Sequence, residues 1–155
     1  MKIRQVRANN RRKALEIVTT RRQFLFPFSR LEVQPTGDDR IAEVYVDREL
    51  ASEGVTYRLQ SGKEATVHIE EVLEYNQEPD YLRANLLYRL TLEAQKRLAA
   101  TSLARREIIR RLGTSPAQLY RLLDQTNDRK SVDQLLRLLQ VLDCEVELVV
   151  RAKTA

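Results

Sequence analysis

The chain has 155 residues, enough for one sizeable domain or two small ones, with a net charge of +5 and a pI near 9.6. Its one cysteine excludes an internal disulfide framework, and no apolar run is long enough to span a membrane. The first residues, MKIRQVRANNRRK, contain no apolar segment of the kind found in secretory signals. We therefore expect a cytoplasmic protein that has no membrane partner.

The charge is unevenly distributed along the chain. Residues 1–30 carry a net charge of +8, residues 31–82 carry −9, and residues 83–130 carry +7. A concentrated basic block is what a protein needs where it neutralises phosphates. We assign that role to the block at 83–130, and we expect the basic residues of the N-terminus to pair with acidic residues of their own domain rather than with phosphate.

Alternation of apolar and polar residues predicts a β-rich first domain. Strands around Leu15–Ile17 and Phe24–Phe28 are joined near Thr19–Arg22, and Asn76–Pro79 breaks the pattern and marks the domain boundary. This domain, residues 1–78, is weakly similar to uncharacterised α+β domains that precede DNA-binding modules. Further strands are expected over 41–47, 55–60 and 65–69, followed by a short helix over 70–75.

The second half of the chain has helical periodicity. Pro79-Asp80 opens a long helix that continues to about Ala100, with leucines at helical spacing on its apolar side. Ser102–Gln125 then predicts two short amphipathic helices bent around Gly113. Gly113 follows the last apolar position of the first helix, where the backbone often adopts a positive φ.

The second short helix begins with a strong capping pattern. Ser115 precedes Pro116 at the first helical position, and Gln118 stands three residues after the serine, which predicts a capping box. A tight turn between two short helices lets the second helix protrude into a major groove. Its buried stripe leaves four residues facing outward: Ala117, Gln118, Tyr120 and Arg121.

Two further elements are expected after the motif. Ser131 and Gln134 repeat the capping-box pattern and open a deeply buried helix that ends near Leu142. Cys144–Arg151 alternates in polarity and predicts a short C-terminal strand. A solitary strand has unpaired backbone groups, so it pairs either with the N-terminal sheet or with the same strand of a second copy. We favour the second arrangement, a homodimer.

The residues IIRRLGTSPAQLYRLLD, then KSVDQLLRLLQVL and CEVELVVR, resemble the lambda-repressor-like, Xre-type helix-turn-helix family. The closest likeness is to HigA-type antitoxins and repressors, and it covers roughly Tyr81–Arg151. In the family a small Ala often occupies the place of Ile109, and Gln often stands where Arg105 and Pro116 stand here. The resemblance implies duplex DNA binding, with base contacts that differ from those of the family at these positions.

The sequence gives almost no support for catalysis. His68 is the only histidine, which is too few for paired imidazole ligands to a metal, and no Asp or Glu has a spacing that would make it a general base. Ser61-Gly62-Lys63 lacks the remaining residues of a phosphate-binding loop. We expect no enzyme activity, catalytic residue, metal or cofactor.

We therefore predict an α+β protein with a β-rich domain over 1–78 and an all-α helix-turn-helix domain with a C-terminal strand over 79–155. Its predicted function is sequence-specific binding of duplex DNA, as a transcriptional regulator or antitoxin-like autorepressor. The alternative is an interaction module that has lost DNA binding and contacts a protein partner, a toxin or a regulator, through the N-terminal domain. Base-reading residues are Ala117, Gln118, Tyr120 and Arg121, and phosphate contacts are Arg105, Arg106, Arg110, Ser115, Arg129 and Lys130.

Overall fold

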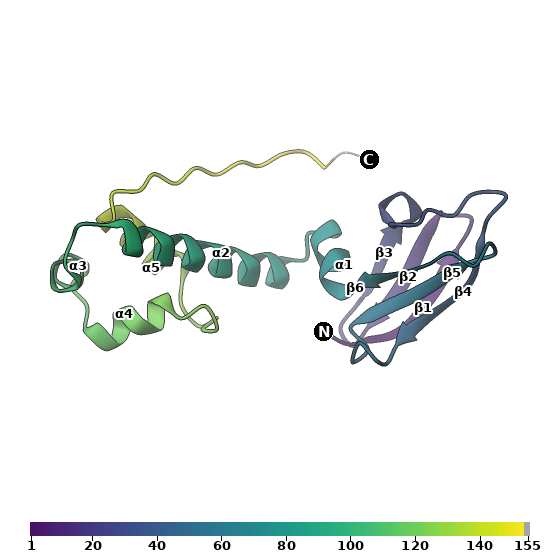
Figure 1. The fold of residues 1–155 in the computed structure, drawn as a ribbon, viewed down its shortest axis with the longest axis horizontal. Coiled ribbons are helices and arrows are strands. Elements are labelled where there is room, and N and C mark those ends of the chain that lie inside the picture. The colour runs from purple at the N-terminus through teal and green to yellow at the C-terminus, as the bar shows by residue number, and fades with distance from the viewer. Residues whose placement is uncertain (154–155) are drawn as a thin grey trace. The chain divides into compact units, whose positions relative to one another are not determined.

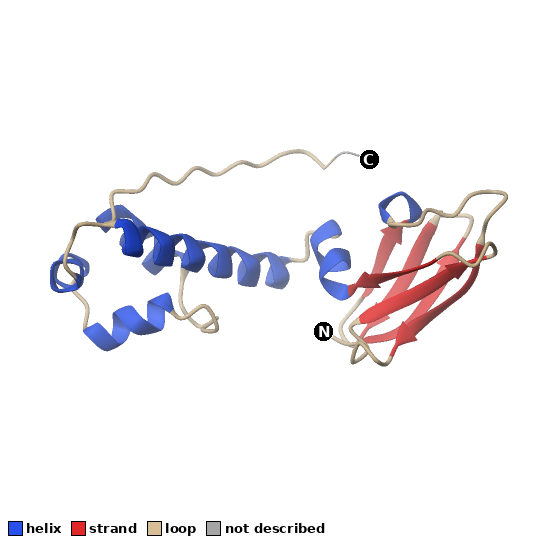
Figure 2. Cartoon of the chain, in the orientation of Figure 1, coloured by secondary structure: helices blue, strands red, loops and turns tan. Residues whose placement is uncertain are grey.

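A computed structural model describes residues 1–153 of the chain (Figure 1). The chain divides into two compact units, Met1–Leu82 and Arg83–Ala155. The boundary expected after residue 78 lies inside the first unit, because that unit also includes the first turn of a long helix, α2 (Pro79–Ala100). Figure 2 shows the strands in red, all in the first unit.

Two antiparallel sheets of three strands each form the first unit. In both sheets the middle strand of the sequence is also the middle strand in space, so each sheet is a simple meander. Ile17 on β2 faces Phe24 on β3, and Val55 on β5 faces Val67 on β6. The sheets are β1 (Ile3–Asn9), β2 (Ala14–Thr19) and β3 (Gln23–Pro27), then β4 (Ile41–Asp47), β5 (Gly54–Leu59) and β6 (Glu64–His68), with a 3-10 turn η1 (Phe28–Arg30) after β3.

One hydrophobic core joins the two sheets to the short helix α1 (Ile69–Tyr75). Leu15 and Ile17 from the first sheet, Tyr57 from the second and Val72 from α1 have no exposed surface. The Tyr57 hydroxyl donates to the carbonyl of Val33 at 2.8 Å, which fixes the long loop before β4 to the core. Burial raises the pKa of this phenol above its ordinary value.

The predicted fold class is wrong in two respects. The N-terminal part consists of two three-stranded sheets plus helix α1, and the C-terminal part has no final strand within the described residues, so the chain is mixed α+β with two sheets followed by helices. Strand β1 was not predicted at all. A bulge between Ile3 and Gln5 shifts its register, which breaks the period-two alternation that marks a strand in sequence.

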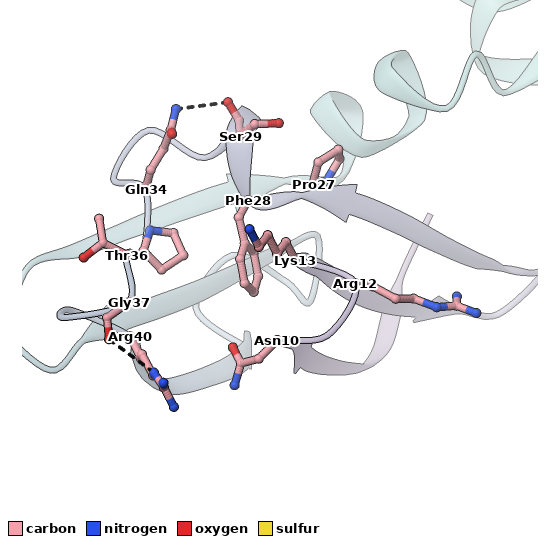
Figure 3. A pocket seen from close by; sticks show the side chains of 11 residues that line it. Asn10, Arg12, Lys13, Pro27, Phe28, Ser29, Gln34, Thr36, Gly37 and Arg40 are labelled. Atoms are coloured by element: carbon pink, nitrogen blue, oxygen red, sulfur yellow. Dashed lines mark hydrogen bonds between the residues drawn. The ribbon is translucent and has the colours of Figure 1, made fainter. Parts of the chain in front are cut away.

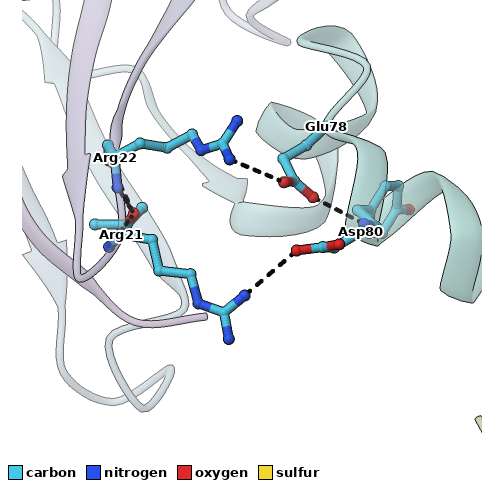
Figure 4. A network of polar contacts seen from close by, with 6 residues as sticks. Arg21, Arg22, Glu78 and Asp80 are labelled. Atoms are coloured by element: carbon cyan, nitrogen blue, oxygen red, sulfur yellow. Dashed lines mark hydrogen bonds and ion pairs between the residues drawn. The ribbon is translucent and has the colours of Figure 1, made fainter.

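The start of α2 is attached to the first sheet by charged side chains (Figure 4). Glu78 is only 4% exposed, and its carboxylate accepts a hydrogen bond from the backbone N–H of Tyr81 at 2.8 Å. Nη2 of Arg22 lies 3.7 Å from Oε1 of Glu78, and Nη1 of Arg21 lies 3.6 Å from Oδ2 of Asp80. These two arginines of the β2–β3 turn pair with acidic residues of the same unit, and in the N-terminal segment Lys2 pairs with Glu53 and Arg7 with Glu16, whereas Arg12 and Lys13 form no ion pair within residues 1–153.

The second unit packs the rest of α2 against three shorter helices, α3 (Arg105–Leu112), α4 (Pro116–Leu123) and α5 (Val132–Val141). The long helix and the two helices bent around Gly113 agree with the sequence prediction. Leu87, Ile108, Leu119 and Leu135, one from each helix, are at most 2% exposed and form the centre of this core.

Residues 144–151 were predicted as a strand and are not one. Residues 142–153 form neither strand nor helix, and Figure 2 draws this segment as a loop after α5. Leu148 is 88% exposed and Val150 is 83% exposed. Alternating polarity creates a strand only where a neighbouring strand supplies backbone partners, and residues 83–153 contain no other strand that does so.

Candidate nucleic-acid interface

The turn between α3 and α4 has the geometry that its glycine predicts. Gly113 lies in the left-handed region, with φ of 62° and ψ of 39°, and its N–H donates to the carbonyl of Arg110 at 3.1 Å. The N–H of Thr114 donates to the carbonyl of Ile109 at 3.2 Å. These two bonds satisfy carbonyls at the end of α3 and turn the chain sharply into α4.

The serine at the start of α4 caps the helix as predicted, but only half of the capping box forms. Ser115 Oγ accepts from the N–H of Gln118 at 3.2 Å, and Pro116 occupies the first turn. Within residues 1–153 the Gln118 side chain accepts no hydrogen bond from the backbone N–H of Ser115. In α5 the corresponding bond is present, because the N–H of Ser131 donates to the Gln134 side chain at 3.0 Å. The Gln118 amide is therefore not held by the cap and is exposed at the beginning of α4.

The four predicted base-reading residues lie on the exposed side of α4. Ala117, Gln118, Tyr120 and Arg121 are all exposed, while Leu119 between them is 2% exposed and packs into the core. Tyr120 is 61% exposed, a large fraction for an aromatic side chain. Gln118 and Arg121 also line a depression of 390 Å³ together with Arg129. Lys130 lines it as well, so four of the predicted contact residues border this depression.

Two predicted residues with different roles contact each other. The guanidinium of Arg105, on α3, lies 5.7 Å from the centre of the Tyr120 ring, on α4. This is the distance of a cation–π contact, which holds both side chains on the exposed surface of the two-helix motif.

The cations of α3 are partly neutralised by a carboxylate that the sequence prediction missed. Glu107 accepts from Arg110 Nε at 3.0 Å and from Arg111 Nε at 2.9 Å. The hydrogen bond from Arg110, followed by that from Arg111, lowers the pKa of Glu107 to about 2. Arg110 and Arg111 follow Glu107 by three and four residues on one helix, a spacing from which these pairs could have been predicted. Arg106 is exposed and forms no ion pair among the described residues.

Lys130 was predicted to contact phosphate, and its ammonium group is bonded to carbonyls of the protein itself. Its side chain is buried, and its ammonium group donates to the carbonyl of Leu122 at 2.9 Å and to that of Asp124 at 2.7 Å. Burial lowers the pKa of this lysine below its ordinary value. Lys130 therefore supports the end of α4 from inside the fold, while its neighbour Arg129 is exposed.

Other side chains complete the cap at the C-terminal end of α4. Gln95 on α2 donates to the carbonyl of Leu123 at 2.7 Å, and Asn127 donates to the carbonyl of Arg121 at 3.1 Å. Carbonyls at a helix end otherwise lack intrahelical partners. With Ser115 at one end and these donors at the other, α4 is capped by hydrogen bonds at both ends.

Comparison with known proteins adds no assignment: no family model, no curated protein and no solved structure matches this chain. Within residues 1–153, no helix has both the length and the apolar character that crossing a bilayer requires. The same residues contain no group of three or more His, Cys, Asp or Glu side chains placed to hold a metal ion.

Proposed function

We propose that the protein binds duplex DNA in a sequence-specific manner through α3 and α4, as a cytoplasmic transcriptional regulator or antitoxin-like autorepressor. The observation that carries this proposal is the exposed side of α4. There Gln118, Tyr120 and Arg121 project from a helix that is capped at both ends. A short helix that follows a tight turn has the shape and the side chains required to enter a major groove.

The proposal gives the residues of α4 different tasks. Arg121 is the main base-reading residue, because a guanidinium matches the two acceptors of guanine with two parallel hydrogen bonds. Gln118 is available for adenine, since its amide is not used in the helix cap. Tyr120 and Ala117 contribute apolar and hydroxyl contacts beside them. Arg121 and Tyr120 are expected to contribute more than Gln118.

Phosphate contacts come from the surrounding cations and fix the protein on the duplex without selecting a sequence. Arg105, Arg106 and Arg129 are exposed and are assigned this role, together with Ser115. Arg110 contributes less, because its guanidinium is paired with the carboxylate of Glu107. Lys130 is omitted from this set, since its ammonium group is buried against carbonyls.

We further propose that the protein acts as a homodimer joined through the apolar segment after α5. Val146, Leu148 and Val150 are between 50% and 88% exposed, and a second copy offers the same apolar side chains for their burial. A two-fold dimer presents two copies of α4 and binds a palindromic site with half-sites about 10 bp apart, or a multiple of that.

The test is fluorescence anisotropy of the full chain with a random duplex at two salt concentrations, followed by selection of preferred sites from a random library. Affinity for the random duplex should fall steeply with salt, because binding releases counterions from the phosphates. Selection should return a palindrome. A protein that binds neither pool at low salt would favour the alternative, an interaction module with a protein partner at the first unit.

A further inference from the structure

A second candidate site lies in the first unit and shares no residue with the DNA-contact set assigned above. It is a depression of 670 Å³ between the turn that joins β1 to β2, the start of η1 and the loop before β4. Figure 3 shows Phe28 near the middle of this depression with Lys13 beside it, Arg40 on one side, and Arg12 extending away from them on the other. Asn10 and Gln34 add polar groups to the lining.

The charge of this depression differs from that of its surroundings. Residues 1–82 carry a net charge of only −1, yet the lining contains three basic side chains and no acidic one. No ion pair within residues 1–153 includes Arg12, Lys13 or Arg40, whereas arginines elsewhere in this unit pair with Glu16, Glu43, Glu78 and Asp80. Arg12 does act electrostatically on Glu16, whose pKa it helps to lower, so Lys13 and Arg40 carry the charge that the protein leaves without an ion pair.

The acidic neighbour of Arg40 is held away from it. The carboxylate of Asp39 accepts from the Ser61 hydroxyl at 2.6 Å and from the Ser61 N–H at 2.9 Å, which ties it to the turn between β5 and β6. The hydrogen bond from the Ser61 side chain is the main cause of the lowered pKa of Asp39. Arg40 itself makes only a long contact, 3.4 Å from Nε to the carbonyl of Gly37.

The backbone holds a cation and an aromatic ring together at the centre of the depression. The N–H of Phe28 donates to the carbonyl of Lys13 at 2.8 Å. Lys13 has a φ of 51°, in the left-handed region that residues other than glycine rarely adopt. Such a conformation costs free energy and persists only where the surrounding structure enforces it, which is frequent at ligand sites. Phe28 is half-buried, so one part of its ring remains accessible.

We propose that this depression binds a small phosphorylated molecule that carries a planar ring. The phosphate is placed between Lys13 and Arg40, because a dianion matches neighbouring cations better than a carboxylate does. The ring packs against Phe28, where aromatic pairs gain from offset or edge contact. Nucleoside monophosphates and aryl phosphates share this chemistry. The site does not depend on DNA binding by α4.

The experiment is isothermal titration calorimetry of the full chain with phenyl phosphate, inorganic phosphate and phenol. Phenyl phosphate should bind with one site per chain, inorganic phosphate about tenfold more weakly, and phenol without saturation. Lys13→Gly and Arg40→Gln should each weaken phenyl phosphate about tenfold, the usual effect of losing one charge-assisted hydrogen bond. Glycine suits the backbone at residue 13, so Lys13→Gly should retain the fold.

Two matched variants distinguish a built site from general attraction of anions. Arg48→Gln removes the same charge as Arg40→Gln from an exposed position outside the lining, and it should leave the affinity unchanged. Phe28→Leu should reduce the affinity for phenyl phosphate to that for inorganic phosphate. Equal losses in Arg48→Gln and Arg40→Gln would overturn the proposal. So would equal affinity for the two phosphates, or displacement of phenyl phosphate by an oligonucleotide that lacks a terminal phosphate.

Discussion

The guanidinium of Arg105 lies over the ring of Tyr120, 5.7 Å from its centre, and connects the two helices of the proposed DNA-binding surface. Each residue therefore helps to hold the other in position, in addition to any contact it makes with DNA. A contact of this kind at an exposed site is worth about 0.5–1 kcal/mol. Replacing one partner is expected to affect the position of the other.

The first prediction is that these two residues are energetically coupled. The losses of DNA affinity in Arg105→Gln and Tyr120→Leu should not be additive, with an interaction free energy of about 0.5–1 kcal/mol in a double-mutant cycle. The same cycle with Arg106→Gln and Tyr120→Leu is the control. Among the described residues Arg105, not Arg106, makes the cation–π contact with this ring, so the losses in Arg106→Gln and Tyr120→Leu should add. Additivity in both cycles would show that the contact is absent in solution.

The second prediction concerns base reading by Arg121. Arg121→Ala should cost about 1–3 kcal/mol on a selected site and relax the preference at one base position. Arg137→Ala is the matched control, because Arg137 is an exposed arginine on α5 that pairs with Asp133 rather than lying on α4. Anisotropy with selected and random duplexes measures both effects. If a folded Arg121→Ala protein kept its sequence preference, the assignment of α4 as the reading helix would be wrong.

The third prediction separates phosphate contacts from supports of the fold. Arg129→Gln should lower the slope of log affinity against log salt by about one and leave stability unchanged. Lys130→Met should instead destabilise the second unit by about 1–3 kcal/mol, because two carbonyls lose their buried donor. Urea unfolding and salt titrations distinguish the two. An unchanged free energy of unfolding in Lys130→Met would contradict the role assigned to Lys130.

The fourth prediction is that Glu107 stays ionised far into the acid range. Its folded pKa is about 2, below the ordinary value of 4.5, because Arg110 and Arg111 donate to its carboxylate. A lowered pKa means that the pairing stabilises the fold above about pH 4.5, and that this contribution is lost as the pH falls toward 2. An NMR titration of the carboxyl carbon should show a midpoint near 2, which Arg110→Gln raises. A midpoint near 4.5 in the unmodified chain would contradict the ion pairs.

The fifth prediction concerns the dimer. A chain that ends at Leu142 should sediment as a monomer and bind its selected palindrome much more weakly, while its affinity for a single half-site changes little. Val146→Ser together with Leu148→Ser gives the same test in a chain of full length, because both side chains are exposed and not part of the core. A truncated chain that sediments as a dimer would place the contact elsewhere.

Helix ends in the second unit follow from the sequence alone. Gly113 in the left-handed region and the complete capping box at Ser131 agree with the prediction, and Ser115 caps α4 although the return bond from Gln118 does not form. Each depends on backbone groups within four residues of the residue concerned, so the local chemistry is sufficient. The apolar stripes of α3, α4 and α5 were likewise visible, because helical periodicity records which side of each helix is buried.

Only the tertiary structure decided which cations face solvent and which extended segments become strands. Lys130 lies in a polar loop that gave no indication of burial, yet the carbonyls of α4, six to eight residues away, accept its ammonium group. Ile3–Asn9 became a strand because β2 supplies its partners despite a bulge, whereas Cys144–Arg151, with better alternation, found no partner among residues 83–153. Backbone pairing between strands and the burial of a charge both depend on groups distant in sequence, and local composition does not record them.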